Sequence, residues 1–342
     1  MKNLLIRADA SPQIGTGHVM RCLALAQAWQ DIGGTVTLAS KSLGERLKRR
    51  IEVEKIGLVD IRAEDDREDA TELAQLAHKD SSFVVLDGYR FGIVHQQVLR
   101  DAGIRHLLFD DYGHAKQYIA DIVLNQNISP DEALYSNRED RTELLLGTRY
   151  ALLRREFRKI VRPGIRRPSS PYRILVNFGG SDPKNLTALA VRALMPLLGN
   201  QTELKVLVGP ENGQLPPIRE AGALSKGITV LHDVAEVARL MDSCNSAISA
   251  AGSTVWELAY LGVPMFLVVT APNQERTAEI LRASDLAVVW NEDELGSGSA
   301  IEQLLAVLGS PERYIQYSSR LLQLVDGAGA ERVCAAIRAK YD

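Results

Sequence analysis

Short apolar runs alternate with longer amphipathic stretches along almost the whole chain. The apolar runs have the length of β-strands, and the stretches between them show the apolar spacing of helices. Strands that are separated by helices form parallel sheets, and the helices then cover both faces of each sheet. The alternation therefore predicts an α/β fold built from doubly wound parallel sheets.

The alternation forms two series. The strands expected in the first series are residues 4–6, 36–39, 59–62, 83–86, 106–109 and 122–124. The strands expected in the second series are residues 173–177, 204–208, 229–231, 246–248 and 265–268. The clearest helix is predicted at 19–31, and helices near 302–308 and 328–340 are predicted to close the chain.

The length of the chain favours two domains. Its 342 residues exceed what one hydrophobic core usually supports, so we expect two domains of about 150 to 170 residues each. The alternation stops at residues 153–172, where basic residues accompany prolines and serines. We predict an N-terminal Rossmann-like domain at 1–152, a linker with a solvated basic face at 153–172, and a C-terminal Rossmann-like domain at 173–342.

The composition of the chain limits the class of protein and the partners that we expect. Apolar residues make up 46% of the chain and charged residues 24%, as in soluble globular proteins. A formal net charge of -3 provides no general attraction to nucleic acid or to an anionic membrane, so we expect neither partner. Three distant cysteines favour reduced thiols, and the beginning of the chain lacks the apolar core of a signal peptide. We expect a cytoplasmic monomer without a membrane span.

A glycine turn near the beginning of the chain is the first candidate site. The strand at 4–6 is followed by Gly15-x-Gly17-His18, and the helix starts there. Glycines let the backbone approach a ligand closely, and the free N–H groups at a helix start favour negative charge. The same helix end disfavours a charged imidazole, so we expect a neutral His18 that can accept a proton beside an anion site.

Two other interpretations of this turn remain open. It can be the start of a dinucleotide-binding fingerprint, but the third glycine of G-x-G-x-x-G falls at Met20. A nicotinamide or flavin cofactor is therefore not expected. His18 can also simply hydrogen-bond the helix start.

Further polar turns follow the strands of the second series. Gly179 and Gly180 follow the strand at 173–177, and their amides can approach a phosphate or simply form a tight turn. Ser253 or Thr254 can cap the next helix, with Glu257 completing a capping box or binding the two hydroxyls of a ribose. The strand at 265–268 leads to a polar loop that carries amide side chains.

Carboxylates follow two strands of the first series. Asp87-Gly88-Tyr89 follows the strand at 83–86, and Asp110-Asp111 follows the strand at 106–109. Such carboxylates often cap the next element, and this interpretation stays open at both places. The phenol of Tyr89 can donate a hydrogen bond to a substrate oxygen.

In their order and spacing, these motifs resemble those of one known family across essentially the whole chain. The motifs are Arg7-Ala-Asp9, Gly15-x-Gly17-His18-x-x-Arg21-Cys-Leu, Asp87-x-Tyr89, Asp110-Asp111, Phe178-Gly179-Gly180-Ser181-Asp182-x-x-Asn185-Leu, Ser249-Ala-Ala-Gly252-Ser253 with Glu257, and Asn273-Gln274-Glu275. The chain resembles the UDP-2,4-diacetamido-2,4,6-trideoxy-β-L-altropyranose hydrolases of pseudaminic acid synthesis, the PseG/SpsG family.

The resemblance implies a GT-B architecture, in which two Rossmann-like domains with parallel sheets face each other across a cleft, as in the related glycosyltransferase MurG. It implies that His18 is the general base, that Tyr89 and Asn273 contact the reacting sugar, and that Glu257 holds the uridine ribose. Asp9 is a candidate to orient His18, or has a plain structural role. The remaining substrate contacts expected are Gly15, Gly17, Arg21, Gly179, Gly180, Ser253, Thr254 and Gln274.

The expected reaction is inverting hydrolysis at C1 of the sugar. UDP leaves as a stabilised anion, so the reaction needs charge stabilisation more than a strong general acid, and His18 would deprotonate the attacking water. We expect neither a metal nor a cofactor, since the six histidines form no H-x-H or H-E-x-x-H pattern. A GT-B glycosyltransferase with a UDP-sugar donor and a noncatalytic nucleotide-sugar binding protein remain alternatives.

Overall fold

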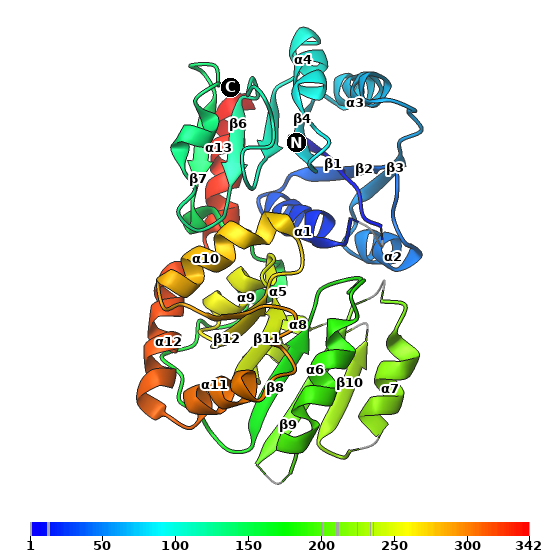
Figure 1. Ribbon diagram of the computed structural model, residues 1–342. Coiled ribbons are helices and arrows are strands. Elements are labelled where there is room, and N and C mark those ends of the chain that lie inside the picture. Colours follow the sequence, from blue (N-terminus) through cyan, green and yellow to red (C-terminus); the bar gives the residue numbers. More distant parts are fainter. Residues whose placement is uncertain are drawn as a thin grey trace. The chain divides into compact units, whose positions relative to one another are not determined.

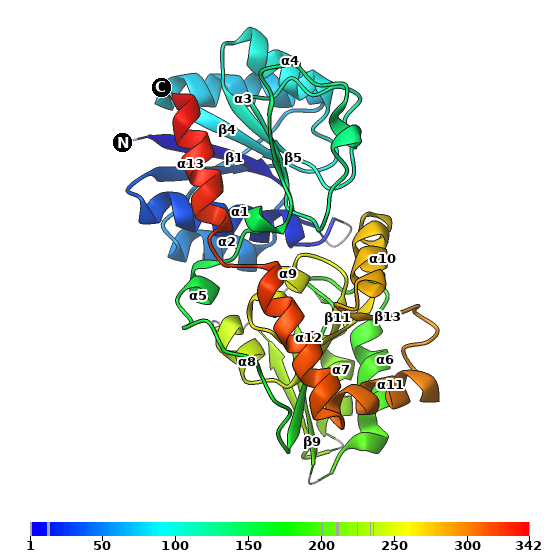
Figure 2. The same ribbon diagram turned by 90° about the vertical axis from the view of Figure 1, so that its left-hand side faces the viewer.

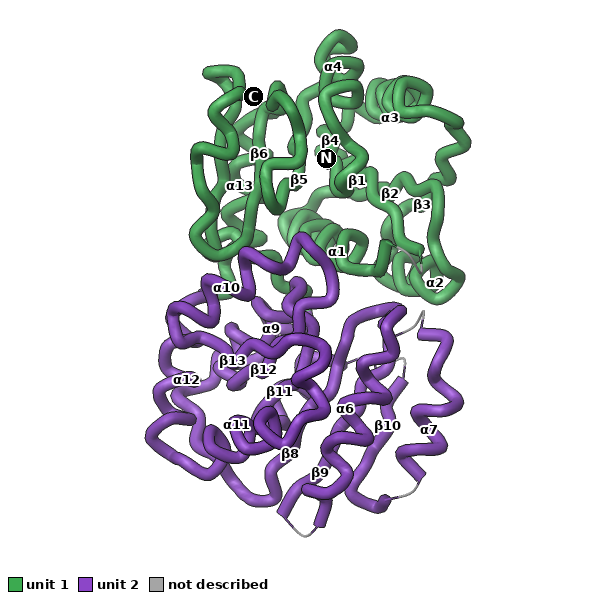
Figure 3. Tube along the Cα trace, viewed as in Figure 1, with its two compact units in different colours: residues 1–155, 327–342 green, residues 156–326 purple. Residues whose placement is uncertain are grey.

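The computed structural model divides the chain into two compact units (Figures 1 and 3). It describes all residues except 1, 12–13, 200, 210–211, 224, 233, 235 and 342. The first unit contains residues 1–155 and 327–342, and the second contains residues 156–326. In the described part of the chain, no helix is both long and apolar enough to cross a membrane.

The first unit is built on a seven-stranded parallel sheet with the order β3-β2-β1-β4-β5-β6-β7. Its strands are β1 (Asn3–Ala8), β2 (Thr35–Ser40), β3 (Gly57–Asp60), β4 (Ser82–Asp87), β5 (His106–Phe109), β6 (Ile122–Asn125) and β7 (Glu143–Leu146). The six strands predicted for this part of the chain are confirmed, and β7 was not predicted.

Helices cover both faces of this sheet. They are α1 (Gly17–Asp31), α2 (Glu45–Val53), α3 (Asp66–Asp80), α4 (Ile93–Asp101) and α13 (Gly329–Tyr341), with the short helices η1 (Glu132–Tyr135) and η2 (Thr148–Tyr150). Side chains alternate along β1, so that Leu4 and Ile6 pack with α1, α2 and α13, whereas Leu5 packs with α3 and α4. The strand period thus builds one core on each face of the sheet.

The last helix packs on the first unit, although residues 173–342 were predicted to form the second domain. Its buried face, which includes Val333, Cys334 and Ile337, is part of the core around α1. Tyr341 stacks on Trp29 and contacts Phe83, and α13 lies beside α1 in both ribbon views (Figure 2). An apolar helical face indicates that a helix is buried, but it does not indicate which sheet it covers.

The second unit is built on a six-stranded parallel sheet with the order β10-β9-β8-β11-β12-β13. Its strands are β8 (Tyr172–Asn177), β9 (Thr202–Val208), β10 (Ile228–His232), β11 (Ser246–Ala250), β12 (Met265–Val268) and β13 (Val288–Trp290). The five strands predicted here are confirmed, and the three-residue β13 was not predicted.

The helices of the second half begin at the predicted linker. They are α5 (Arg155–Arg158), α6 (Leu186–Leu194), η3 (Met195–Leu197), α7 (Leu215–Ala223), α8 (Val237–Asp242), α9 (Thr254–Tyr260), η4 (Pro272–Gln274), α10 (Glu275–Ala283), α11 (Gly298–Leu308) and α12 (Pro311–Leu324). The basic face expected at 153–172 is partly engaged, because Arg155 pairs with Asp31 and Glu54, and Arg166 pairs with Asp242.

Candidate functional site

In the first unit, the predicted residues gather where the order of the strands changes direction. The chain proceeds outward from β1 to β3 on one side, and β4 then starts the other side. The last residue of β1, Ala8, lies beside Asp87, the last residue of β4. Loops diverge at such a switch point and leave a crevice at the carboxyl ends of the strands. His18 lies after β1, Asp87 is the last residue of β4, and Tyr89 lies after β4.

A buried carboxylate binds the imidazole of His18. Nδ1 of His18 lies 2.7 Å from Oδ1 of Asp87, whose side chain is fully buried, while the imidazole keeps 11% of its surface exposed. An ionised carboxylate only accepts hydrogen bonds, so Nδ1 carries the hydrogen of this bond. In the neutral ring, Nε2 then has the free lone pair. The pair therefore orients His18 as a proton acceptor.

Asp87 is itself held by two further residues of α1. Nε and Nη2 of Arg21 each donate to Asp87 at 2.7 Å, and the thiol of Cys22 lies 3.3 Å from Oδ2. Burial alone would raise the pKa of Asp87, but the charge of Arg21 and the contact with His18 hold it well below its usual range. Asp87 thus stays ionised at neutral pH.

Arg21 also connects this pair to a second carboxylate. Nη1 of Arg21 donates to Oδ1 of Asp111 at 2.7 Å, and the hydroxyl of Tyr89 donates to Oδ2 of Asp111 at 2.8 Å. The rings of His18 and Tyr89 meet edge to face, with their centroids 4.9 Å apart. Burial and the charge of Asp111 raise the pKa of Tyr89, so the phenol stays protonated. Because its proton is directed at Asp111, Tyr89 presents an oxygen lone pair rather than the donor that we expected.

Gly88 makes the turn between Asp87 and Tyr89 possible. Its φ is +154°, and a Cβ at this position would lie 2.9 Å from the ring of Phe91. A larger residue would therefore strain the backbone and push against a buried ring. The glycine lets one carboxylate end the strand while the phenol two residues later turns toward the same cluster.

Asp110 is a capping residue, as one of the two open interpretations proposed. Its carboxylate accepts hydrogen bonds from the backbone amides of Tyr112, Gly113 and His114 and from the hydroxyl of Tyr118. Burial would raise the pKa of Asp110, but His114 and these donors lower it to about 2. Asp110 therefore shapes the loop that presents Asp111 and Tyr112.

Asp9 does not contact His18, contrary to the expectation that it can orient this residue. Oδ1 of Asp9 is 2.6 Å from Nη1 of Arg7 and accepts from the hydroxyl of Ser40 and the amide of Lys41. Arg7 is fully buried and also binds Asp69 on α3. Asp9 belongs to this neighbouring ion-pair network, so it has the structural role that the sequence analysis left open.

The first glycine turn lies at the start of α1. Gly15 has a φ of +79°, Gly17 is the first residue of α1, and the N-cap residue Thr16 makes no side-chain cap bond. Pro12 and Gln13 of the same turn lie outside the described residues. No acidic side chain occupies the first turn of α1. His18 is the second residue of this helix, so it lies in the turn whose N–H groups have no partner within the helix.

In the second unit, three neighbouring strands bring the remaining predicted residues to one sheet edge. β8, β11 and β12 are adjacent, and the strand order changes direction between β8 and β11. Gly179 and Gly180 follow β8, Ser253 and Thr254 follow β11, and Asn273 lies in η4 after β12. The carboxyl ends of parallel strands point to one edge, so these loops are neighbours.

The glycine turn after β8 lies against another glycine. Gly179 has a φ of +81°, and a Cβ built on Gly209 would lie only 2.2 Å from the carbonyl oxygen of Gly179. Asp182 accepts hydrogen bonds from the amides of Leu186 and Thr187 and so caps α6 internally. The first amides of α6 are therefore used within the protein, and the turn at Gly179 and Gly180 is the part that a ligand can approach.

The loops after β11 and β12 carry the other predicted contacts. Ser253 is the N-cap residue of α9 but makes no side-chain cap bond, so the expected capping box does not form. Glu257 lies partly buried in the first turn of α9. Oε1 of Gln274 accepts hydrogen bonds from the amide and hydroxyl of Thr270, which braces the loop after β12.

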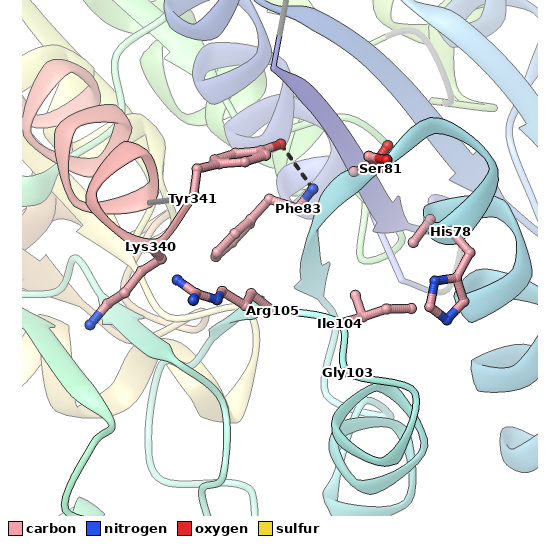
Figure 4. Close-up of a pocket in the computed structure, with 10 residues that line it drawn as sticks. His78, Ser81, Phe83, Gly103, Ile104, Arg105, Lys340 and Tyr341 are labelled. Carbon is pink, nitrogen blue, oxygen red and sulfur yellow. Dashed lines mark hydrogen bonds between the residues drawn. The ribbon is translucent and has the colours of Figure 1, made fainter.

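A small hollow lies at the opposite edge of the first sheet (Figure 4). It has a volume of about 230 Å³, and His78, Arg105, Lys340 and Tyr341 line it. α3 ends at Asp80 and α4 at Asp101, so the carbonyl ends of two helices lie near this edge. Helix C-termini disfavour anions, whereas the helix starts at the other edge favour them. We therefore place the candidate site at the carboxyl ends of the strands.

Within the described residues, no group of three His, Cys, Asp or Glu side chains is placed to hold a metal ion. Asp110 and Asp111 are both engaged, with backbone amides and with Arg21 and Tyr89 respectively. The three cysteines are buried and free of disulfide bonds. The site is thus built from side chains that bind each other and from backbone amides.

Comparisons with known proteins found relatives of the chain. The chain is 26% identical over 278 residues to the UDP-2,4-diacetamido-2,4,6-trideoxy-β-L-altropyranose hydrolase of Campylobacter jejuni, which covers 80% of this chain and 94% of that protein. It is 25% identical over 273 residues to an uncharacterized protein of Methanocaldococcus jannaschii, covering 78% of this chain and 55% of the archaeal protein. It is also 26% identical to the spore coat polysaccharide biosynthesis protein SpsG of Bacillus subtilis, over 49% of this chain and 50% of SpsG.

The chain is a homologue of these proteins. This confirms the resemblance expected from the motifs. No protein-family model matches the chain.

Solved structures confirm the GT-B fold. MurG of Acinetobacter baumannii matches with a TM-score of 0.62 and 16% identity, over 99% of this chain and all of that one. Alr3699/HepE of Anabaena, solved in complex with UDP-glucose, matches with a TM-score of 0.62 and 13% identity over 99% of this chain and all of that one. At these identities the likeness establishes the architecture alone.

Proposed function

We propose that the chain is a UDP-sugar hydrolase that cleaves the C1–O bond of UDP-2,4-diacetamido-2,4,6-trideoxy-β-L-altropyranose with inversion. The products are UDP and the free 2,4-diacetamido-2,4,6-trideoxy-L-altrose. The observation that carries the proposal is the bond between Nδ1 of His18 and buried Asp87, which leaves Nε2 to take a proton. The homologous hydrolase of Campylobacter jejuni supports the choice of substrate.

In the proposed mechanism, His18 removes a proton from a water molecule that attacks C1. The hydrogen bond to Asp87 stabilises the imidazolium that forms, as a carboxylate does for a catalytic histidine in other hydrolases. Attack opposite to the departing phosphate inverts C1 through an oxocarbenium-like transition state. Tyr89 and Asn273 contact the reacting sugar in this proposal.

When the C1–O bond breaks, the departing UDP takes the negative charge. Stabilisation of this charge by the protein therefore replaces a general acid. We assign this task to the second unit, where Gly179, Gly180, Ser253 and Thr254 offer backbone amides and hydroxyls. Glu257 is assigned to the ribose, because its carboxylate can accept hydrogen bonds from the two ribose hydroxyls. Neither a metal nor a cofactor is included in the proposal.

The proposal is tested by incubating the purified protein with a panel of UDP-sugars and following UDP release and the first anomer formed by NMR. We expect rapid release from the diacetamido sugar without any acceptor, with the inverted anomer appearing first. In ¹⁸O-labelled water, the label should enter the C1 oxygen of the sugar. Label in the phosphate of UDP would show that water attacks phosphorus instead.

A GT-B glycosyltransferase is the second candidate, because solved glycosyltransferases share the fold over the whole chain. In that case His18 would deprotonate an acceptor hydroxyl. UDP release that requires an added acceptor would establish this alternative and contradict the hydrolase. Binding of the UDP-sugar without any turnover would indicate a noncatalytic binding protein.

A further inference from the structure

We propose that Arg21 is a positioning residue, which holds His18 and Tyr89 together through two carboxylates, and not a ligand of the substrate phosphates. This inference rests on the proposed function for its kinetic test, but its structural basis does not. It replaces the substrate contact that the sequence analysis assigned to Arg21. It makes the fork of one guanidinium responsible for the geometry of the site.

Three of the five N–H donors of Arg21 bind carboxylates within the protein. Nε and Nη2 bind the two oxygens of Asp87, and Nη1 binds Asp111, each at 2.7 Å. The side chain is only 8% exposed, and its guanidinium lies 4.7 Å from the ring centre of Phe109. Turning these donors toward a phosphate would leave two buried carboxylates without their cation, which is strongly destabilising.

The same contacts connect the two groups that face the sugar in the proposed function. Asp87 accepts a hydrogen bond from Nδ1 of His18, and Asp111 accepts one from the hydroxyl of Tyr89. Arg21 lies between the two carboxylates, so it sets the distance between the imidazole and the phenol. A planar fork fixes both carboxylates at once, whereas an ammonium group provides only a point charge.

The net charge of the cluster depends on whether His18 has taken up a proton. Arg21 carries one positive charge, and Asp87 and Asp111 carry two negative charges, so the cluster is neutral only when His18 is protonated. Nη2 of Arg21 lies 3.3 Å from Nδ1 of His18, so the positive charge of Arg21 opposes the positive charge that the imidazole gains when Nε2 takes up a proton. Cys22 on Asp87, Asn127 on Asp111 and Tyr89 are uncharged at neutral pH. The ring of Tyr89 also contacts Tyr112 and His114, and His114 is paired with Asp110 rather than with His18.

Without Arg21, the imidazole would face two carboxylates and no cation. It would then hold a proton more tightly before the reaction, and less of the protein would have a free base at neutral pH. Loss of a phosphate ligand would have the opposite signature, because it weakens nucleotide binding and leaves the proton on His18 unchanged.

The test compares Arg21→Gln and Arg21→Lys with the wild-type chain. For Arg21→Gln we expect kcat to fall about 100-fold, because base catalysis contributes at least this much. We also expect the acidic limb of the pH profile of kcat/KM to move to higher pH. For Arg21→Lys we expect a smaller loss of about 10-fold and a nearly unchanged acidic limb, since the charge remains but the fork is lost. The dissociation constant of UDP should stay within about twofold in both variants.

Arg100→Gln is the matched control. Arg100 pairs with Glu139 in the same unit and donates to the carbonyl of Ile119, away from the cluster. This variant also removes an arginine ion pair, so it reports any general loss of stability. We expect its kcat and its pH profile to match the wild type.

An NMR titration of the imidazole of His18 in the free protein gives a second readout that needs no turnover. We expect its titration to move to higher pH in Arg21→Gln and to stay near the wild-type value in Arg21→Lys. If Arg21→Gln does not fold, Arg21→Lys alone carries the test, with its fall in kcat at unchanged UDP affinity. If the wild type releases UDP from no sugar, the proposed function fails while this titration still tests Arg21.

Two results overturn the inference. A fall in UDP affinity of tenfold or more, with an unchanged titration of His18, would make Arg21 a phosphate ligand. Wild-type kcat and an unchanged pH profile in Arg21→Gln would show that the cluster does not need its guanidinium.

Discussion

The two units of the chain have the same kind of sheet but different chemistry at their switch points. In the first unit, His18 and Arg21 on α1, Asp87 at the end of β4 and Asp111 after β5 bind one another in a largely buried cluster. In the second unit, the corresponding loops carry glycines and the N-cap residue Ser253, which makes no side-chain cap bond. Side chains preorganise the first site, and backbone groups shape the second.

This difference fits a division of labour in the proposed function. Proton transfer needs a base whose orientation and surroundings are set before substrate arrives, and buried ion pairs provide this. Binding of a diphosphate needs amides that the ligand can approach closely, which glycines allow. Substitutions in the first unit should therefore lower turnover, whereas substitutions in the loops of the second unit should lower nucleotide affinity.

The largest effect is expected for His18→Asn. Asparagine can still donate to Asp87, but it cannot accept a proton from water, so we expect kcat to fall about 10³-fold. Calorimetry should find the affinity for UDP unchanged, because the nucleotide is assigned to the second unit. Substantial hydrolysis by this variant would remove His18 from the role of base.

The next largest effect is expected for Gly209→Ala. The added Cβ would lie 2.2 Å from the carbonyl oxygen of Gly179 and 2.3 Å from that of Gly180, so the glycine turn must move. We expect the affinity for UDP to fall about 10- to 100-fold, since a displacement of this size misplaces the binding groups.

Gly199→Ala is the control for this variant, because a Cβ on Gly199 would meet no atom within 4 Å. Its UDP affinity should equal that of the wild type. If Gly209→Ala instead left UDP binding intact and abolished turnover alone, the proposed division between the units would be wrong.

Acid should destabilise the first unit before the second. Asp9, Asp69, Asp87 and Asp110 of the first unit have lowered pKa values, that of Asp110 being about 2. A carboxyl group with a lowered pKa in the folded state stabilises the fold above its ordinary pKa of about 3.9, and this stabilisation is lost as the pH falls further. We expect the first unit to lose stability between about pH 4 and pH 2.

Tryptophan fluorescence can follow the two units separately. Trp29 is buried in the first unit, whereas Trp256 and Trp290 are buried in the second. Trp29→Phe leaves reporters only in the second unit, and the double variant Trp256→Phe, Trp290→Phe leaves one only in the first. Identical acid transitions in the two proteins would contradict the expected order.

The smallest effect is expected for Tyr341→Phe. Its hydroxyl accepts from the amide of Phe83 at 2.9 Å and also binds the carbonyl of Asn3, and both partners lie in the first unit. We expect a loss of about 1 kcal/mol in the free energy of unfolding, because the hydrogen-bonding group that is removed is partly buried. Denaturant unfolding followed through Trp29, on which Tyr341 stacks, measures this change. A shift of the second unit's transition instead would show that α13 does not belong to the first.

The unpredicted elements show where local sequence signals are weak. β7 and β13 are edge strands of three or four residues, too short to show a clear period. α13 was predicted as a helix, but its place on the first unit follows from packing with Trp29 and the core around α1. The distribution of apolar residues within α13 is the same whichever sheet it covers.

The sequence alone determined the α/β class, most strands and the place of His18 at the start of a helix, because periodicity, glycines and helix starts act over a few neighbouring residues. The tertiary structure decided which carboxylate binds His18 and which carboxylates bind Arg21. His18 and Asp87 are 69 residues apart, and Arg21 and Asp111 are 90 apart, so their pairing depends on strand order and register. Asp9, which lies nearer in the chain, was one candidate to orient His18, but buried Arg7 binds it instead.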